Sequence, residues 1–392
     1  MGTTTLAAAL YDNEGSLLAE TSGWNPQGDF GADVISRVSR SMAGETRALA
    51  LAVRRGINEL VEGLCEMAGK PAAAIDTLVI TGNTAMLYLL TERDVRCLGR
   101  TPFRADWLAG EWLVGADLEL ICPKARVLLP PCISAFVGAD ITTGLLAVNL
   151  QDGDSPGLFV DIGTNGEMAL WNQGRLTCCA TAAGPAFEGA GLSMGMQAKE
   201  GAVRHVKYFQ EMADVWNPPV SEFQVEVIGD TPPRGICGSG VVDALRCLLD
   251  SGRMDETGYL AEEKAVIAGD VVITQQDIRQ VQLAKGAIRA GMEVLLEKEG
   301  LSVADARELL VAGNFGTYLD PESAGRIGLL PDILVKQGRI ALCGNTALAG
   351  AARLLLDHEA LEAAQRLVVH ARWINLAVNP RFQEKFVECM NF

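Results

Sequence analysis

The stretch GLFVDIGTNGEMALWNQGRL, residues 157–176, holds an apolar run that ends in Asp161, a Gly-Thr-Asn-Gly turn and a second apolar run. The second run turns again at Asn172-Gln173-Gly174. Short apolar runs joined by turns of this composition predict a β-hairpin. A carboxylate and two glycines at its entrance suit a metal–nucleotide site, because glycines let backbone N–H groups approach phosphate oxygens and an aspartate can hold Mg²⁺.

The same device occurs near the start of the chain. Residues 2–15, GTTTLAAALYDNEG, repeat the order of residues 163–174: Gly-Thr, a short apolar strand and an Asn-x-Gly turn. An ordinary strand turn would explain either loop alone, but a purely structural turn need not repeat its threonine. The two copies stand about 160 residues apart, which predicts a duplicated domain rather than a solenoid.

The remainder of the chain alternates helical and strand patterns, which is typical of an α/β fold. We expect a boundary at the polar, turn-rich QDGDSP (151–156), and therefore two lobes, 1–153 and 154–392. Helices are predicted at 47–68, 135–148, 241–250, 278–299 and 343–356, and strands at 77–80 and 309–312.

Composition and charge limit the classes of partner and the cellular compartment that we expect. The net charge is −16 over 392 residues, which argues against nucleic acid or an anionic membrane surface as the main partner. The sequence has neither an 18-residue apolar stretch nor a basic leader, so we expect a cytoplasmic protein with no membrane span. The ten cysteines form no C-x-x-C pair and lie mostly in apolar segments, which indicates buried, reduced thiols.

Three further glycine-rich motifs are GPAFEGAGLSMG (184–195), GICGSG (235–240) and AGNFG (312–316). GICGSG precedes a predicted helix and could present N–H groups to an anion, although helix packing through small residues explains it equally well. Cys237 in this motif could ligate a cluster, but a lone loop cysteine is more often inert. No G-x-x-x-x-G-K-[ST] phosphate loop occurs.

Taken in order, these motifs resemble the acetate and sugar kinase/Hsc70/actin superfamily, whose fold is a duplicated actin-like (ribonuclease H-like) α/β ATPase with two lobes. WNPQGDFGADVISRV (24–38) and VITGNTAMLYLL (79–90) make the chain similar, within that superfamily, to the ATPase domain of reductive activators of corrinoid proteins. The match covers essentially the whole chain.

The resemblance implies a set of site residues. It places the first phosphate loop at Gly2, Thr3, Thr4 and Thr5, and the second at Asp161, Gly163, Thr164, Asn165 and Gly166. Asp161 would hold Mg²⁺, and Glu167 or Glu188 would position the attacking water. The other implied nucleotide-binding residues are Gly184, Gly238, Ser239, Gly240, Gly313, Asn314, Phe315 and Gly316.

Family members couple ATP hydrolysis to a low-potential electron transfer that reduces a Co(II) corrinoid to Co(I). The resemblance therefore implies ATP and Mg²⁺ as cofactors, a corrinoid (cobalamin-binding) protein and a ferredoxin-like donor domain as partners, and a homodimer. The family's first loop reads Asp-Ile-Gly-Thr-Thr, whereas here Met1 stands in the place of the isoleucine. No ferredoxin cysteine spacing occurs, so we expect the iron–sulfur cluster in a domain absent from this chain.

Three alternatives remain open at this stage. One is a small-molecule kinase of the same superfamily, although no further aspartate motif stands out for it. Another is a non-catalytic nucleotide sensor, which the departure in the first loop favours. The last is a dimer bridged by a cluster at Cys237, as in activators of 2-hydroxyacyl-CoA dehydratases.

Overall fold

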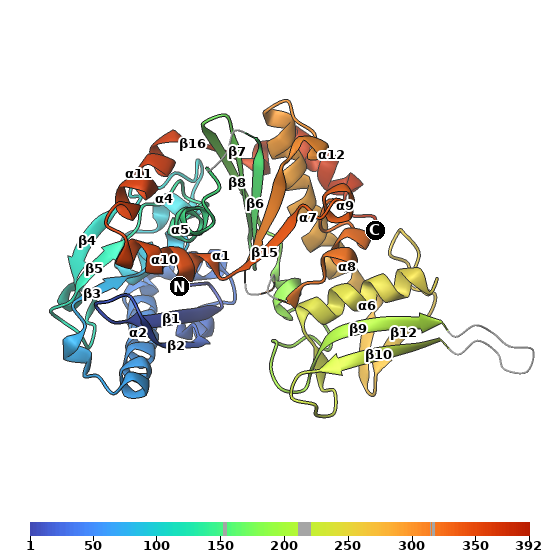
Figure 1. Ribbon diagram of the computed structural model, residues 1–392, viewed down its shortest axis with the longest axis horizontal. Helices are drawn as coiled ribbons and strands as arrows, with labels where there is room; N and C mark the ends of the chain where they lie inside the picture. Colours follow the sequence, from blue (N-terminus) through green and yellow to red (C-terminus); the bar gives the residue numbers. More distant parts are fainter. Residues whose placement is uncertain (152–154, 211–220, 314, 316–317) are drawn as a thin grey trace, which may run out of the picture. The chain divides into compact units, whose positions relative to one another are not determined.

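The computed structural model describes residues 1–151, 155–210, 221–313, 315 and 318–392. The chain forms two compact units (Figure 1). Unit 1 comprises Met1–Asp152 and Asn345–Trp373, and unit 2 comprises Gly153–Gly344 and Ile374–Phe392. The expected division near residue 153 therefore coincides with the first passage between units, but the chain later returns to unit 1 for one further segment.

Unit 1 begins with the predicted hairpin. Strand β1 (Thr5–Tyr11) pairs antiparallel with β2 (Leu17–Trp24), and helix α2 (Thr46–Ala68) packs on both strands. A small sheet of order β3-β5-β4 completes the strands of this unit. The other elements are η1 (Pro26–Phe30), α1 (Val34–Arg40), η2 (Ser41–Glu45), η3 (Ala72–Ala74), β3 (Thr77–Val79), α3 (Thr84–Leu90), α4 (Arg96–Gly99), β4 (Glu111–Val114), η4 (Gly115–Leu118), β5 (Arg126–Leu129), α5 (Ala139–Val148), α10 (Thr346–Leu356) and α11 (Ala360–His370).

Helices α5 and α10 lie side by side within unit 1 (Figure 1). They can approach closely because a Cβ added at Gly350 would stand 1.9 Å from the carbonyl oxygen of Thr143. The four residues before and into α10, Gly-Asn-Thr-Ala at 344–347, repeat those at 82–85 before α3. Asn83 and Asn345 both cap their helices, since each side chain accepts an N–H from three residues further on.

Unit 2 is organised around a mixed sheet in which β15, β14, β6, β7 and β8 are neighbours in that order. β14 runs parallel to both β6 and β15, whereas β6, β7 and β8 form the antiparallel meander predicted from residues 157–181. The long helix α7 packs on β7 and β8 (Figure 1). Nearly every residue of β6 and β7 is buried, as expected for strands that are covered by other elements.

The elements of unit 2 run as follows: β6 (Gly157–Ile162), β7 (Gly166–Asn172), β8 (Arg175–Thr181), η5 (Pro185–Glu188), β9 (Ala202–Gln210), β10 (Ser221–Val227), β11 (Gly235–Ile236), α6 (Gly238–Asp250), β12 (Lys264–Ala268), β13 (Val271–Thr274), α7 (Gln275–Lys298), η6 (Val303–Asp305), β14 (Glu308–Ala312), α8 (Pro321–Arg326), α9 (Asp332–Lys336), β15 (Ile340–Gly344), η8 (Leu376–Val378) and α12 (Pro380–Glu388). Strand β16 (Ala371–Ile374) lies where the chain leaves unit 1 for the last time.

The predicted elements are confirmed, with shifted ends. The helix expected at 135–148 begins only at Ala139, because Gly138 must pass close to Asn83: a Cβ at Gly138 would stand 2.4 Å from the Cα of Asn83. The helix expected at 241–250 begins earlier, at Gly238. In both cases the glycine motif, rather than the apolar pattern, decides where the helix begins.

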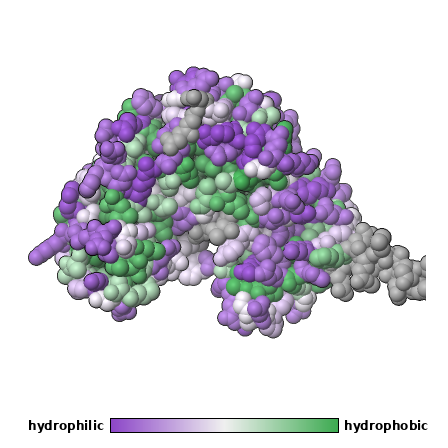
Figure 2. All heavy atoms as spheres, in the orientation of Figure 1, coloured by the Kyte–Doolittle hydropathy of each residue, from purple (hydrophilic) through white to green (hydrophobic). Residues whose placement is uncertain are grey.

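The surface carries hydrophobic as well as charged residues. Figure 2 shows hydrophobic residues among the hydrophilic ones on the face drawn. Leu17 on β2, and Leu51 and Met67 on α2, are exposed. No helix of the described residues is both long enough and apolar enough to cross a bilayer.

Candidate functional site

The second glycine-threonine loop lies where β6 ends and β7 begins. Its turn is closed by a hydrogen bond from the Gly163 N–H to the Asn165 carbonyl, 2.9 Å. Gly166 is the first residue of β7, and a Cβ there would stand 2.9 Å from the side chain of Ile288 on α7. The glycine at 166 therefore lets α7 pack directly beneath the loop.

Asp161 and Glu167 are directly opposite each other in the β6–β7 ladder. Opposite residues of an antiparallel pair point to the same face with Cβ atoms about 4.5–5.5 Å apart, and like charges there repel. Asp161 is half-buried and Glu167 is only 8% exposed, so this repulsion is poorly screened by water. Two oxygen donors in this arrangement fit a hard divalent cation such as Mg²⁺.

The strand ends of β6, β14 and β15 meet beside Asp161. Gly313, the first residue after β14, has φ +98°, and a Cβ there would stand 2.5 Å from the Ile162 carbonyl oxygen and 2.9 Å from Oδ1 of Asp161. Its N–H donates to the carbonyl of Gly344 at 3.0 Å. Ligands of α/β folds bind outside the carboxyl ends of such parallel strands.

Of the remaining implied nucleotide-binding residues of the AGNFG motif, Phe315 is buried, whereas Asn314 and Gly316 lie outside the described residues. Phe315 stacks on Phe187 of η5, with ring centroids 4.9 Å apart. A Cβ at Gly238 would stand 1.9 Å from the Phe187 carbonyl oxygen and 2.8 Å from the ring of Phe315. The three glycine motifs of unit 2 therefore converge on this aromatic pair.

Ser239 and Gly240 of the GICGSG motif pack against the neighbouring strand β9. The Ser239 hydroxyl, on a residue 3% exposed, donates to the Arg204 carbonyl at 2.9 Å. A Cβ at Gly240 would stand 2.3 Å from the Val203 carbonyl oxygen. Ser239 and Gly240 thus fit the helix-packing interpretation, and Gly238 is the member of the motif that lies against the other loops.

Glu188 closes over the second loop. The backbone N–H of Thr164 donates to Oε1 of Glu188 at 3.0 Å, and the Thr164 hydroxyl donates to Oε2 at 2.7 Å. The Gly184 N–H donates to the Thr164 carbonyl at 2.9 Å, so the start of the GPAFEGAG motif is tied to the same residue. Gly184 has φ +83°, a conformation that favours glycine.

The first glycine-threonine loop, in unit 1, is held by two asparagines instead. Nδ2 of Asn25 donates to the Gly2 carbonyl at 2.9 Å, and Nδ2 of Asn83 donates to the Thr3 hydroxyl at 3.2 Å. Backbone bonds from Gly2 to Thr5 and from Asn25 to Thr4 complete the loop. The sequence motifs at 24–38 and 79–90 thus supply the side chains that shape residues 2–5.

Asp140, in the first turn of α5, is a candidate that the sequence analysis missed. Its N–H and that of Ala139 both donate to the Gly82 carbonyl, which places it beside the turn that carries Asn83. Burial raises the pKa of Asp140 to about 6. An aspartate directly after the Gly-Ala that starts a small-residue helix was the available signal.

A cluster at Cys237 finds no support in the geometry. Cys237 is 3% exposed, and its thiol lies 3.4 Å from both the Val203 carbonyl oxygen and the Ser239 hydroxyl. Within the described residues, no three His, Cys, Asp or Glu side chains are grouped so that they could hold a metal ion. The burial of Cys237 and the contacts of its thiol do not fit a cluster at this position.

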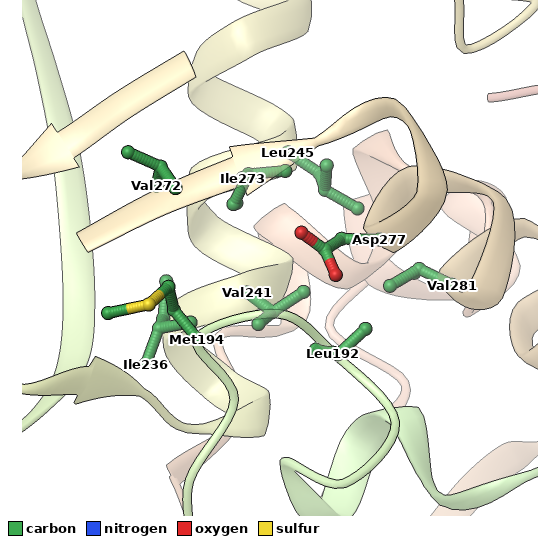
Figure 3. A pocket seen from close by; sticks show the side chains of 9 residues that line it. All are labelled: Leu192, Met194, Ile236, Val241, Leu245, Val272, Ile273, Asp277 and Val281. Atoms are coloured by element: carbon green, nitrogen blue, oxygen red, sulfur yellow. The ribbon is translucent and has the colours of Figure 1, made fainter. Parts of the chain in front are cut away.

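A small apolar pocket elsewhere in unit 2 holds one carboxylate, that of Asp277 (Figure 3). Asp277 accepts the N–H and the hydroxyl of both Ser193 and Thr274. Four such bonds satisfy the carboxylate, so this residue anchors the segment after η5 to the start of α7. The other lining residues are Leu192, Met194, Ile236, Val241, Leu245, Val272, Ile273 and Val281.

Comparison with known proteins gives concordant matches along the chain. The family model described as the C-terminal domain of RACo, the ASKHA domain, matches residues 155–392, and the RACo middle region matches residues 1–153. The corrinoid activation enzyme RamQ of Eubacterium limosum is 35% identical over 99% of this chain and 68% of its own length.

Two further relatives extend the comparison. The Co(II) methylated amine-specific corrinoid protein reductase of Methanosarcina barkeri is 29% identical over 74% of this chain and 57% of its own length. The solved structure of a reductive activator for corrinoid, iron-sulfur protein has a TM-score of 0.90 at 34% identity, covering 100% of this chain and 65% of that one. The chain thus spans between about half and two thirds of the length of these relatives.

Proposed function

The chain belongs to the RACo family, and from that premise we propose that it binds and hydrolyses MgATP to drive the reduction of a Co(II) corrinoid protein to the Co(I) state. The fold and the convergence of the glycine motifs at the strand ends of unit 2 support the nucleotide part of this proposal. The names of the relatives, a corrinoid activation enzyme and a Co(II) corrinoid protein reductase, support the corrinoid part.

The residues divide between binding and positioning. Thr3 and Thr4 of the first loop, and Thr164 and Asn165 of the second, would supply N–H and O–H donors for phosphate oxygens. Asp161 would hold Mg²⁺, which when bound neutralises charge on the transferring phosphoryl group. Glu167, which is opposite Asp161 in the ladder, would orient the attacking water.

The remaining predicted residues shape the site. Gly313 brings the β14 end against Asp161, and Gly238 packs against the Phe187–Phe315 pair. Because phosphoryl transfer needs mainly positioning and charge neutralisation, a slow ATPase is expected from this set.

The redox step balances as one electron taken up by Co(II) to give Co(I), while water attacks the terminal phosphorus and the bridging oxygen leaves with ADP. We propose a low-potential iron–sulfur protein or domain as the electron donor, because the family resemblance implies one. A homodimer in an anaerobic cytoplasm completes the proposal. The family resemblance supports the homodimer, and the sensitivity of Co(I) to oxygen supports the anaerobic setting.

The observation that carries the proposal is the Asp161–Glu167 carboxylate pair beside the second loop, with Gly313 packed against it. The test is anaerobic: the chain, MgATP, a reduced ferredoxin-type donor and a Co(II) corrinoid protein are mixed, and Co(I) is followed by its absorbance. Co(I) should form only with ATP. ATP hydrolysis that leaves Co(II) unchanged with every corrinoid partner tried, or the transfer of phosphate to a small molecule, would count against the corrinoid assignment.

A further inference from the structure

Glu188 occupies the donors of the second loop that a phosphate would need. Both carboxylate oxygens are used, one by the N–H of Thr164 and one by its hydroxyl, at 3.0 and 2.7 Å. Gly163 lies against the same carboxylate, since a Cβ there would stand 3.3 Å from Oε1. A carboxylate that accepts an N–H and an O–H from a glycine-rich loop is placed as a phosphate anion would be.

A phosphate and Glu188 cannot both take these two hydrogens. An N–H and an O–H each carry one hydrogen, and two anions that compete for them also repel each other. A nucleotide phosphate that binds Thr164 must therefore displace the Glu188 carboxylate from this loop.

The backbone next to Glu188 is held in place by packing. Phe187, the residue before Glu188, is 2% exposed and stacked on Phe315, so it fixes the backbone at this point. Glu188 itself is half-buried, and Gly189 follows it in a left-handed conformation, φ +75°. The exchange that we consider is therefore a movement of the Glu188 side chain.

We propose that Glu188 is an internal competitor for the terminal phosphates of a nucleoside triphosphate: it holds the second loop in the nucleotide-free protein and is exchanged for phosphate on binding. The inference rests on the proposed function, because it takes that nucleotide as the ligand. It makes Glu188 a positioning residue whose presence weakens nucleotide binding.

The first test is calorimetry of MgATP and of adenosine with the wild-type chain and Glu188→Ala. Without the competitor we expect ATP to bind about tenfold more tightly, as is typical when charged hydrogen-bond partners no longer have to be exchanged. Adenosine lacks phosphates, so its affinity should not change. Glu188→Gln, which keeps one acceptor and loses the charge, should lie between the two proteins. Glu384→Ala on α12, an exposed carboxylate, controls for net charge and should match the wild type.

The second test needs no nucleotide. Hydrogen exchange of peptides that cover residues 163–167 should be several-fold faster in Glu188→Ala than in the wild type, and ATP should slow it again. If ATP binds equally or more weakly in both Glu188 variants, or if exchange is unchanged in both, the competitor role is wrong. If neither adenosine nor ATP binds the wild type, the proposed function fails and the competitor role fails with it, and faster exchange in Glu188→Ala then shows only that Glu188 holds the loop.

Discussion

The two glycine-threonine loops have similar sequences but opposite hydrogen-bond polarity. In unit 1 the Thr3 hydroxyl accepts a hydrogen bond from Asn83, whose other amide atom is fixed by capping α3. The hydrogen of the Thr3 hydroxyl is therefore not used in this bond. In unit 2 the Thr164 hydroxyl gives its hydrogen to Glu188. The Thr3 hydroxyl thus accepts in the first loop where the Thr164 hydroxyl donates in the second.

The difference shows that a repeated motif does not imply a repeated role. The residues that set the hydrogen bonds of each loop lie outside both motifs: Asn25 and Asn83 for the first loop, and Glu188 for the second. The second loop also has a carboxylate pair, Asp161 and Glu167, beside it in the ladder.

The largest expected effect concerns that carboxylate pair. Asp161→Asn removes the charge that would hold Mg²⁺, and we expect ATP turnover to fall by about 100-fold or more, as is typical when a transition-state charge loses its stabilising partner. Phosphate release measures it. Asp250→Asn at the end of α6 makes the same change outside the site and should leave turnover unaltered. Near-wild-type turnover in Asp161→Asn would mean that the second loop does not hold the metal.

The next effect concerns the packing of Asp161 on Gly313. Gly313→Ala puts a methyl group against the Ile162 carbonyl and Asp161 at φ +98°, and should lower the free energy of unfolding by about 2–4 kcal/mol. Gly338→Ala is the matched control, because Gly338 also has positive φ but nothing within 4 Å of its Cβ, so its cost should be only about 1 kcal/mol. Urea denaturation compares the two. Equal losses of unfolding free energy in the two variants would show that the contact between residue 313 and Asp161 is not tight.

A direct test of the polarity difference uses the same substitution in each loop. Thr3→Val removes a donor that is available to phosphate, so ATP affinity should fall by about tenfold. Thr164→Val removes a phosphate donor, but it also removes one of the two hydrogen bonds that hold Glu188 on the loop. The net loss of ATP affinity should therefore be smaller than in Thr3→Val. Calorimetry under identical salt conditions gives the order. A larger loss in Thr164→Val than in Thr3→Val would reverse the comparison.

The smallest effect concerns Asp140, near the turn that shapes the first loop. Burial raises its pKa to about 6 from 3.8, so the folded protein binds its proton more tightly than the unfolded chain does. The charged form therefore costs stability above about pH 6, and this cost disappears as the pH falls towards 4. Asp140→Asn should raise the free energy of unfolding by about 1–2 kcal/mol at pH 8 and leave it unchanged at pH 4. Urea titrations at the two pH values check it.

Much of the local structure could be predicted because it depends on neighbours in the sequence. The turn residues around 163–166 and 172–174 define the hairpin, and the apolar pattern defines α2 and α7 to within a few residues. The GPAFEGAG, GICGSG and GNFG motifs were each expected near the nucleotide, and they converge on Phe187 and Phe315.

What could not be predicted depends on contacts between residues far apart in the sequence. The return of residues 345–373 to unit 1 leaves no signal in the local sequence pattern, although the family resemblance implies that the helices at 135–148 and 343–356 pair, as α5 and α10 do. The start of α5 at Ala139 is decided by the approach of Gly138 to Asn83. The partner of Thr164 stands 24 residues away, and only the folded chain brings it there.

The close approach of α5 and α10 has a consequence for sorting unassigned sequences. Because a methyl group at position 350 would overlap the Thr143 carbonyl oxygen at 1.9 Å, proteins that share this helix crossing should keep glycine there whatever else diverges. Two features can therefore anchor an alignment of such sequences without any nucleotide-binding residue. One is the glycine five residues after the helix-capping Asn345, and the other is the Asn-Thr-Ala sequence that occurs at both 83–85 and 345–347.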